Sequence, residues 1–529
     1  MTGWNSIPAL VRRAAESFGD REGVVDDISF SFAELGDRVR AAARGAIAAG
    51  IEHGDRVAIW APNTWEWIIA ALGAVSAGGV LVPINTRFKG REANYVLSKS
   101  GARLLFTVRG FLDLDFPALL EDAGPLPGAL ERVVLLRGLP GEGTESFDEF
   151  ASRGSRDLDA EADRRASRVS PEDLSDIIFT SGTTGSPKGV MATHGQSLRV
   201  FDTWSSLVGL AEGDRYLIVN PFFHTFGYKA GVLACLMRGA TIVPHAVFDV
   251  PTVLEKIVAE RITVLPGPPT LYQSILNTPG RSEHDLSSLR LAVTGAAVVP
   301  VELIERMRTD LTFSTVLTAY GLTESTGTAT MCRQGDDPET IATTSGCAIP
   351  DTEVRVVDDA GTEVTRGEPG EVVVRGYNVM RGYYEDPEQT DRTIDAEGWL
   401  HTGDIGVMDE RGYLRITDRK KDMFIVGGFN AYPAEIENEL LRHPAVAQAA
   451  VVGAPDDRLG EVGVAFVVPR AGETADAEEI TAWAKKQMAN YKVPRRVEIV
   501  DALPVNASGK VLKFELRERA AELVAAEQP

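Results

Sequence analysis

Apolar side chains along the first part of the chain alternate between a helical period and short unbroken runs. Residues 32–49 carry apolar positions at the spacing of an amphipathic helix, whereas residues 56–60 form an apolar run after a Gly-Asp turn, which predicts a strand. The longest apolar stretch, residues 67–82, contains interrupting glycines and falls short of the ~20 residues that a bilayer requires. We interpret this stretch as a buried helix followed by a turn and a buried strand at residues 80–84.

The same alternation continues over residues 176–350, with strands predicted at residues 216–219, 241–243 and 291–294. Strands that alternate with helices favour an α/β fold with largely parallel sheets. The preceding residues 154–170 are rich in charged and small residues and are predicted to be a solvated connector.

The last third of the chain has a different pattern. Short strands and turns predict a small β-rich subdomain at residues 353–357, 370–375 and 413–416. A compact α+β pattern follows, with helices and strands predicted at residues 433–442, 449–452, 464–468 and 480–489. The expected α/β architecture is therefore a large N-terminal domain, residues 1–420, of two αβ-layered subdomains plus the β-rich subdomain, and a small α+β C-terminal domain, residues 421–529.

Composition narrows the classes of function. The 529 residues carry a net charge of −22, which argues against nucleic acid as a partner because a phosphate backbone requires a basic surface. Three cysteines without a CxxC spacing do not suggest a disulfide framework, and the N-terminus lacks the features of a signal peptide. A cytoplasmic enzyme is expected, with no membrane span.

A glycine-rich segment, DIIFTSGTTGSPKGV at residues 176–190, follows an apolar strand. Glycine lets backbone N–H groups approach a ligand, the hydroxyl residues add donors, and Lys188 adds a positive charge, so the segment suits a polyphosphate. It is not a Walker A loop, because Pro187 stands where that motif requires glycine.

The segment closely resembles the signature of the adenylate-forming superfamily of acyl-CoA synthetases, amino-acid adenylation domains and luciferases. The resemblance covers nearly the whole chain, and it implies ATP, Mg²⁺ and coenzyme A as cosubstrates or cofactors and a C-terminal domain that is mobile. It assigns ATP binding in this segment to Thr180, Ser181, Gly182, Thr183, Thr184, Gly185 and Lys188.

Two further elements match the superfamily. In YGLTES, Tyr320 is expected to stack on adenine, Thr323 to contact the α-phosphate, and Glu324 to help hold Mg²⁺. A carboxylate beside a triphosphate is tolerable when a divalent ion bridges them. The turn that resembles the adenine-lining segment, and the glycine after Tyr320, add Gly295, Ala296, Ala297 and Gly321 to the expected ATP-binding residues.

The C-terminal motifs resemble the family in the same order. Asp404 of Thr-Gly-Asp is expected to bind the ribose hydroxyls, with Ile416 and Arg419 in the same nucleotide site. The resemblance implies a hinge at Lys421, a coenzyme A site at Gly427 and Gly428, and a catalytic Lys510 that bridges the substrate carboxylate and the α-phosphate. The expected catalytic set is Lys510, Glu324, Thr184 and His224, with no acid–base role for His224.

The acid itself is harder to predict. Thr225 stands where amino-acid-activating members place an aspartate, so an amino acid is not expected, and Gly321 replaces a pocket-closing tryptophan of acetate-type members, which favours a larger acid. Lys229 either donates to a ketone or hydroxyl oxygen of the substrate, points to solvent, or forms a salt bridge. The resemblance implies an acyl pocket formed by His224, Phe226, Lys229, Ala230, Ala296, Ala319 and Gly321.

The segments NPFFHTFGYKAGVLAC, ITVLPGPPTLYQS and VLTAYGLTES look most like the actinobacterial ligases that activate the bicyclic hydrindanedione propionate left from steroid rings C and D. Medium-chain fatty acids and aryl acids are the alternatives. The expected mechanism forms an acyl-adenylate and pyrophosphate, and coenzyme A then displaces AMP.

Other classes fit the sequence less well. It lacks the Lys-x-Asp-Gly of lysyl-AMP transferases, the G-x-S-x-G of serine hydrolases and the H-E-x-x-H of zinc hydrolases. A luciferase-like oxygenase would share the first half-reaction, and a module that only senses nucleotide or acyl-CoA would not need Lys510 or Glu324. The sequence leaves the oligomeric state open, with a homodimer as one alternative.

Overall fold

The structure, a computed structural model, divides into two compact units. The first contains residues 1–342, 348–353 and 374–400, and the second contains residues 343–347, 354–373 and 401–529. The residues described below are 4–180, 187–295, 299–419, 422–426, 429–456, 459–488, 490–505 and 511–525. The predicted domain boundary at residue 421 falls outside them and stays a prediction.

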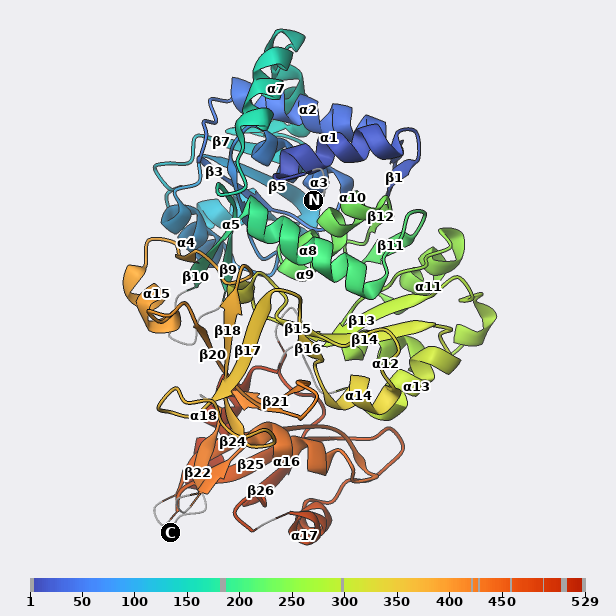
Figure 1. The fold of residues 1–529 in the computed structure, drawn as a ribbon, viewed down its shortest axis with the longest axis vertical. Coiled ribbons are helices and arrows are strands. Elements are labelled where there is room, and N and C mark those ends of the chain that lie inside the picture. The colour runs from blue at the N-terminus through green and yellow to red at the C-terminus, as the bar shows by residue number, and fades with distance from the viewer. Residues whose placement is uncertain are drawn as a thin grey trace. The chain divides into compact units, whose positions relative to one another are not determined.

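The first unit is built on a largely parallel sheet, in agreement with the pattern of apolar runs (Figure 1). The central strands β9, β4, β3, β5, β7 and β8 pair in parallel, and β10 and β19 extend the sheet in antiparallel pairing. The strand order is β19 (Gly382–Tyr383), β10 (Lys188–Thr193), β9 (Leu174–Thr180), β4 (Val80–Pro83), β3 (Arg56–Trp60), β5 (Leu104–Phe111), β7 (Arg132–Arg137) and β8 (Thr144–Ser146), with β6 (Leu114–Asp115) beside β5.

The helices of this layer follow from their sequences. Helix α2 (Phe32–Ala48) begins where Ser31 and Glu34 cap each other reciprocally, which satisfies N–H groups that have no partner inside the helix. In α3 (Trp65–Ser76) every residue after Trp65 is buried, as expected for a helix that is apolar on all sides. Helices α1, α4, α5 and α6 span Ile7–Phe18, Gly90–Ser100, Phe116–Asp122 and Phe147–Arg153.

The predicted connector at residues 154–170 is mostly helical. It contains a 3₁₀ turn, η1 (Arg156–Leu158), and α7 (Asp159–Arg168), in which only Ala162 is buried. Arg165 pairs with Glu161 one turn earlier at 2.7 Å, and Arg40 of α2 pairs with Asp163 at 2.6 Å. Charge pairs within the helix and with α2 therefore stabilise a segment whose lack of apolar periodicity concealed the helix.

A second sheet completes the αβ layers of the first unit. Strands β2 (Ser29–Ser31), β1 (Glu22–Val25), β12 (Thr241–Pro244) and β11 (Arg215–Ile218) pair in this order. Val264 bridges β11 to β13 (Leu291–Gly295), which pairs with β14 (Thr315–Tyr320) and then β15 (Thr330–Met331). Its helices are α8 (His194–Val208), α9 (Thr225–Gly227), α10 (Ala234–Arg238), α11 (Val250–Ala259), α12 (Pro269–Asn277) and α13 (Val301–Thr309).

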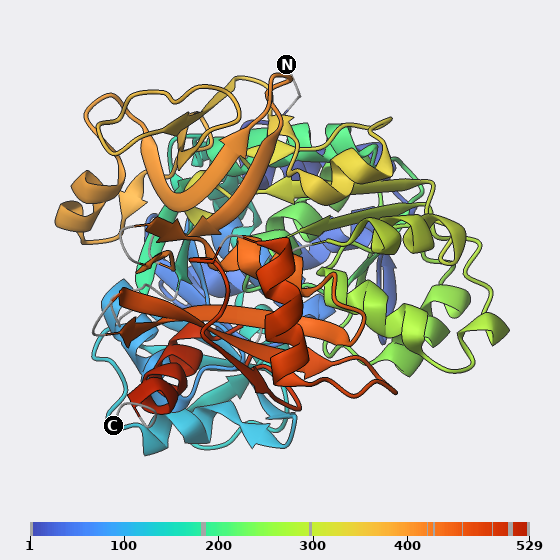
Figure 2. The ribbon, with the colours of Figure 1, turned by 90° about the horizontal axis from the view of Figure 1, so that it is seen from below.

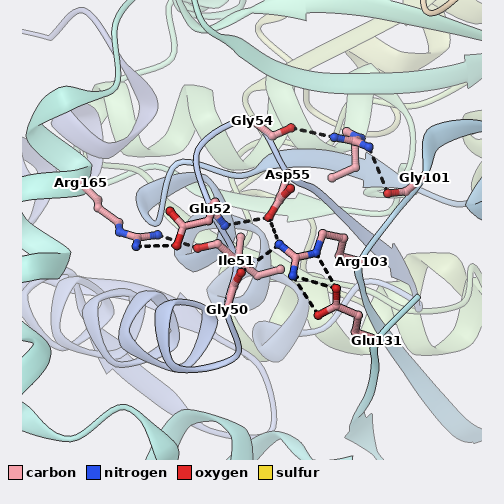
Figure 3. Close-up of polar contacts among 10 residues, drawn as sticks. Gly50, Ile51, Glu52, Gly54, Asp55, Gly101, Arg103, Glu131 and Arg165 are labelled. Atoms are coloured by element: carbon pink, nitrogen blue, oxygen red, sulfur yellow. Dashed lines mark hydrogen bonds and ion pairs between the residues drawn. The ribbon is translucent and has the colours of Figure 1, made fainter. Parts of the chain in front are cut away.

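A cluster of ion pairs holds the amino edge of the central sheet (Figure 3). Asp55, Arg103 and Glu131 each directly precede a strand, β3, β5 or β7. Arg103 donates to both oxygens of Glu131 at 2.9 Å and also pairs with Asp55. Because the strands are parallel, this cluster lies at the edge opposite the carboxyl end of β9, where the glycine-rich segment begins.

The predicted β-rich subdomain is a four-stranded sheet in the order β17 (Thr352–Val357), β18 (Pro369–Gly376), β20 (Leu400–Met408) and β21 (Leu414–Arg419). The C-terminal part contains β22 (Phe424–Val426), β23 (Phe429–Ala431), β24 (Val446–Asp456), β25 (Gly460–Pro469) and β26 (Arg496–Ile499). These five C-terminal strands form one sheet. One of its faces packs on α16 (Pro433–Leu440) and α17 (Ala477–Gln487), and the other face packs on α18 (Lys513–Ala525) (Figure 2). None of the helices in the described ranges is long and apolar enough to cross a membrane.

Candidate active site

The glycine-rich segment joins two antiparallel strands at the carboxyl edge of the central sheet. Thr180 ends β9 and pairs in register with Lys188, the first residue of β10. The strand pairing therefore places one predicted hydroxyl donor and the predicted cation side by side. The predicted residues Ser181, Gly182, Thr183, Thr184 and Gly185 lie outside the described part of the chain.

Two residues from a later segment hold the Lys188 side chain. Its Nζ donates to Oε1 of Gln389 at 2.7 Å and lies 5.2 Å from the ring centroid of Tyr383. Gln389 belongs to α15 (Pro387–Thr393), and Tyr383 belongs to β19, which pairs with β10. An ammonium above an aromatic face is attracted by the ring electrons, so these contacts orient the charge beside Thr180.

The same tyrosine contacts the predicted metal ligand. Glu324 lies in the short 3₁₀ turn η4 (Thr323–Ser325), and its Oε1 accepts a hydrogen bond from the Tyr383 hydroxyl at 2.9 Å. Burial, together with the negative charge of Glu324, raises the pKa of Tyr383 well above its usual value. Tyr383 therefore stays protonated and donates to the carboxylate.

A buried asparagine fixes the turn that carries Thr323 and Glu324. Asn378 is fully buried, and its side-chain Nδ2 donates to the Thr328 backbone carbonyl at 3.0 Å. The backbone carbonyl of Asn378 accepts a hydrogen bond from Thr326 Oγ1 at 2.8 Å. The Met380 N–H also donates to the Glu324 carbonyl at 2.8 Å. The loop after β18 thus satisfies the polar backbone of the turn and sets the direction of Glu324.

Two predicted adenine-site residues lie on adjacent strands. Gly295 ends β13 and is in register with Ala319 of β14, one residue before Tyr320. Gly295 has a φ of +152°, and a Cβ at this position would lie 2.7 Å from the Ala319 carbonyl oxygen. Only glycine permits this approach of the two strands. Ala296 and Ala297 lie outside the described part of the chain.

The backbone packing around Gly321 requires a glycine, independently of the size of the acyl pocket. A Cβ on Gly321 would lie 2.6 Å from the Gly327 carbonyl carbon and 2.6 Å from Thr328 Cα. The backbone of the turn therefore occupies the direction that a side chain would take. The glycine permits a close backbone approach, and its contribution to a roomy acyl pocket stays a prediction.

The predicted acyl-pocket residues His224, Phe226 and Ala230 lie on one continuous helical segment. His224 precedes α9 and accepts the Phe226 N–H through Nδ1 at 3.2 Å. Ala230 is completely buried in η2 (Tyr228–Leu233), a π-helical turn. π-Helical turns are wider than α-helical turns and are frequent at functional sites.

The ring of His224 is neutral. Its residue surface is exposed, yet desolvation by the surrounding protein lowers its pKa below the usual value. Because Nδ1 accepts the Phe226 N–H, the proton of the neutral ring is on Nε2, which makes His224 a hydrogen-bond donor and gives it no charge.

Lys229 takes one of the alternatives that the sequence left open. Its side chain is 1% exposed, and Nζ lies 2.8 Å from Oδ1 of Asp176 in β9. The ammonium is thus engaged in a buried ion pair. The structure favours this salt bridge over a contact with the substrate.

The remaining predicted nucleotide residues lie in the second unit. Asp404 is buried in β20, and its backbone pairs in register with that of Arg419 in β21. Ile416 lies on the same strand as Arg419, opposite Gly406. Thr402 Oγ1 donates to the Val372 carbonyl at 2.6 Å, so the Thr-Gly-Asp turn is anchored to β18. The predicted Lys421, Gly427, Gly428 and Lys510 lie outside the described residues.

Sequence reasoning missed Tyr383, Gln389 and Asn378. All three belong to residues 378–389, which contain no motif that we had singled out. Because 59 residues separate Glu324 from Tyr383, no local spacing indicates their contact. The available signal was the segment Gly-Tyr-Tyr followed by an Asp-Pro helix start, which predicts an ordered element without indicating its partner.

Comparisons with known proteins show which families and proteins the chain resembles. The model of the AMP-binding enzyme family matches residues 11–384, and the model of the AMP-binding enzyme C-terminal domain matches residues 435–510. The chain is 52% identical to 3-[(3aS,4S,7aS)-7a-methyl-1,5-dioxo-octahydro-1H-inden-4-yl]propanoyl:CoA ligases from Rhodococcus jostii and Mycobacterium tuberculosis, over 97% of this chain and 98% of each relative. The crystal structure of the anthranilate CoA ligase AuaEII with anthranoyl-AMP superposes with a TM-score of 0.89 at 29% identity, covering 99% of both chains.

Proposed function

Since this chain belongs to the AMP-binding enzyme family, we propose that it is the acyl-CoA ligase for one bicyclic acid, 3-(7a-methyl-1,5-dioxo-octahydro-inden-4-yl)propanoate. The observation that carries the proposal is the 52% identity, over nearly the full length of both chains, to two ligases named for this acyl group. Similarity of this extent includes the segments that form the predicted acyl pocket.

The proposed reaction has two steps, the first at the α-phosphorus of ATP and the second at the acyl carbon of the substrate. The substrate carboxylate attacks the α-phosphorus of ATP and releases pyrophosphate, which leaves the acyl group bound to AMP. The coenzyme A thiol, after losing its proton, then attacks the acyl carbon and releases AMP. Neither step requires a covalent bond to the protein, so its contribution is positioning and charge stabilisation.

The first unit provides groups for the adenylation step. Lys188, oriented by Gln389 and Tyr383, offers a positive charge to the phosphates of ATP. We keep Thr180, Tyr320 and Thr323 as nucleotide contacts, because they end or follow strands at the same site. In the second unit, we keep Asp404 for the ribose, since a carboxylate can accept both hydroxyls.

The residues present fit a magnesium ion that is bound with its nucleotide. An ion that binds with its nucleotide is coordinated mainly by phosphate and water, so one protein carboxylate is sufficient. Glu324 would supply the protein carboxylate, and Tyr383 holds one of its oxygens. When bound, the ion neutralises charge that accumulates on the phosphates.

The acid-binding groups combine apolar surface with one neutral donor. Phe226 packs edge-on against Trp204, with ring centroids 6.3 Å apart, and Ala230 is small and buried. His224 offers an uncharged N–H donor. An oxygenated two-ring acid matches such a lining better than an unbranched chain, which has no polar group along its length.

ATP and coenzyme A are intracellular metabolites, and a cytoplasmic location therefore belongs to this proposal. The two half-reactions can be tested separately. Purified protein with Mg·ATP and the bicyclic acid is expected to release pyrophosphate and form the acyl-adenylate, and added coenzyme A is expected to convert it to the thioester, both detected by mass spectrometry. Adenylate without thioester would reject coenzyme A as the acceptor, and no adenylate from this acid would reject the substrate.

A further inference from the structure

A buried ion pair links two elements of the first unit that carry different parts of the proposed reaction. Asp176 lies in β9, which ends four residues later at Thr180, and Lys229 lies in the π-helical turn η2. Nζ of Lys229 and Oδ1 of Asp176 are 2.8 Å apart, and both side chains are 1% exposed. The pair therefore connects the strand that leads into the glycine-rich segment with the turn that carries Ala230.

The carboxylate of this pair is held on both sides. Its other oxygen, Oδ2, accepts from Ser175 Oγ at 2.6 Å, and Ser175 Oγ lies 3.2 Å from both the Ala192 carbonyl oxygen in β10 and Ser197 Oγ in α8. Ser175 of β9, which itself contacts β10 and α8, thus holds the carboxylate of Asp176 in place. Lys229 cannot move relative to β9 without leaving a buried charge unpaired.

Two titratable side chains beside the pair, His194 and Tyr228, are neutral. His194, which is 1% exposed, has a pKa lowered to about 3, mainly by burial and in part by the positive charge of Lys229, so it is neutral. Tyr228 is buried, and burial together with the negative charge of Asp176 raises its pKa far above the usual value, so it is also neutral. Neither His194 nor Tyr228 therefore supplies a charge that could replace Asp176 or Lys229 in their ion pair.

Stability alone does not account for such a pair. The cost of removing two charges from water often exceeds their mutual attraction, and an apolar pair of the same shape is frequently as stable. An ion pair does hold two specific charged atoms close together, here 2.8 Å apart, which packed apolar side chains do not. The pair is therefore better explained as a means of positioning β9 and η2 relative to each other than as a source of stability.

We propose that the Asp176–Lys229 pair is a positioning device that fixes η2, and with it the acyl-binding residues, relative to β9 and the phosphate-binding segment. The proposal rests on the proposed function, because it assigns the acid to η2 and ATP to the segment after β9. The distance between the substrate carboxylate and the α-phosphorus then depends on this pair. A shift of about 1 Å between reacting groups is sufficient to reduce a rate ~100-fold.

The decisive variant removes both charges together. The double variant Asp176→Asn, Lys229→Met leaves no unpaired buried charge, so it is expected to fold, whereas Lys229→Met alone leaves Asp176 uncompensated. The matched control is Arg103→Met, which breaks ion pairs at the opposite edge of the same sheet (Figure 3). Thermal unfolding of all four proteins shows which remain folded.

The kinetic measurement is pyrophosphate exchange with the best acid that the wild type accepts. The double variant is expected to lose about 10-fold or more in kcat with a smaller change in the KM for ATP, because binding groups remain while their relative positions change. Arg103→Met is expected to retain the wild-type kcat. A folded double variant with wild-type kcat and KM values would overturn the proposal.

A second measurement does not require any acid. Hydrogen exchange of residues 225–233 is compared with and without Mg·ATP. ATP binding is expected to slow this exchange in the wild type and in Arg103→Met, and to leave it unchanged in the double variant. Equal protection in the double variant would overturn the proposal even if every tested acid failed, and failure of all acids with the wild type would instead reject the proposed function.

Discussion

The hydroxyl of Tyr383 donates a hydrogen bond to Oε1 of Glu324 at 2.9 Å, and the face of the same ring lies 5.2 Å from the ammonium of Lys188. One side chain therefore contacts both the predicted metal ligand and the predicted phosphate-binding cation. Because Tyr383 is in β19, whose register with β10 is fixed by backbone pairing, the two charged groups have a shared rigid support.

Replacing Tyr383 with Phe is expected to keep the ring and remove the hydrogen bond to Glu324. A hydrogen bond to a charged group contributes about 1.5–3 kcal/mol, so adenylation should slow by roughly 10- to 100-fold, and the dependence on Mg²⁺ concentration should shift to higher values. Pyrophosphate exchange at several Mg²⁺ concentrations measures both effects. The control, Tyr384→Phe, changes the neighbouring hydroxyl. Equal rates for the two variants would contradict the support of Glu324 by Tyr383.

Gln389 is expected to affect ATP binding through Lys188. Gln389→Leu removes the oxygen that accepts from Nζ at 2.7 Å, so the ammonium loses one orienting contact. We expect the KM for ATP to rise by about 3- to 10-fold, which is less than the full value of a hydrogen bond to a charged group, because the ammonium keeps its charge and its contact with Tyr383. The effect on the KM for the acid should be smaller. Glu388→Ala on the same helix breaks only an exposed pair with Arg392 and serves as the control. If both variants alter the KM for ATP equally, Gln389 has no specific role.

Replacing Gly321 with Ala tests whether the close approach of its backbone to Gly327 and Thr328 determines the shape of the turn. In Gly321→Ala the new methyl group would be placed 2.6 Å from backbone atoms of Gly327 and Thr328, so the turn has to move. We expect a loss of about 1–3 kcal/mol in the free energy of unfolding and a lower adenylation rate, because Thr323 and Glu324 lie in this turn. Gly128→Ala is the control, since no atom lies within 4 Å of its added Cβ. A Gly321→Ala protein as stable and active as the control would reject the argument.

His194 is expected to make stability depend on pH. Burial lowers its folded-state pKa to about 3, below its ordinary value of 6.5. Below pH 6.5 the unfolded chain therefore binds a proton that the folded protein does not bind, so the free energy of unfolding falls with pH. At pH 5 this amounts to about 2 kcal/mol. Urea unfolding at pH 7 and pH 5 should show a loss smaller by this amount in His194→Gln. Parallel losses in both proteins would refute the assignment.

Much of the fold could be predicted because apolar runs and helix caps are local signals. Strand β3 was predicted with the bounds that the structure gives, and α2 differs from its prediction by one residue at its end. Helix α7 was missed because charge pairs with α2, rather than an apolar stripe, hold it. Such pairs join residues that are distant in the sequence, and no periodicity marks them.

The residues of the candidate site likewise fall into those that local motifs indicate and those that only the folded structure reveals. Lys188 and Glu324 belong to short motifs, so the chain alone was sufficient to propose them as site residues. Tyr383, Gln389 and Asn378 act on those residues through contacts that exist only in three dimensions. Lys229 shows the remaining limit, because its sequence neighbours were compatible with a substrate contact, a solvent-facing side chain or an ion pair. Only the position of Asp176 in the structure distinguishes among these alternatives.

The most direct test of the account is a competition between acids in one reaction. Purified protein receives Mg·ATP, a limiting amount of coenzyme A and equal concentrations of the bicyclic propionate, decanoate and cinnamate, and mass spectrometry measures the ratio of the three thioesters. We expect the bicyclic thioester to dominate by about 100-fold or more, which corresponds to about 2.7 kcal/mol of discrimination. A predominance of the decanoyl or cinnamoyl thioester would contradict the proposed substrate while leaving the ligase activity intact.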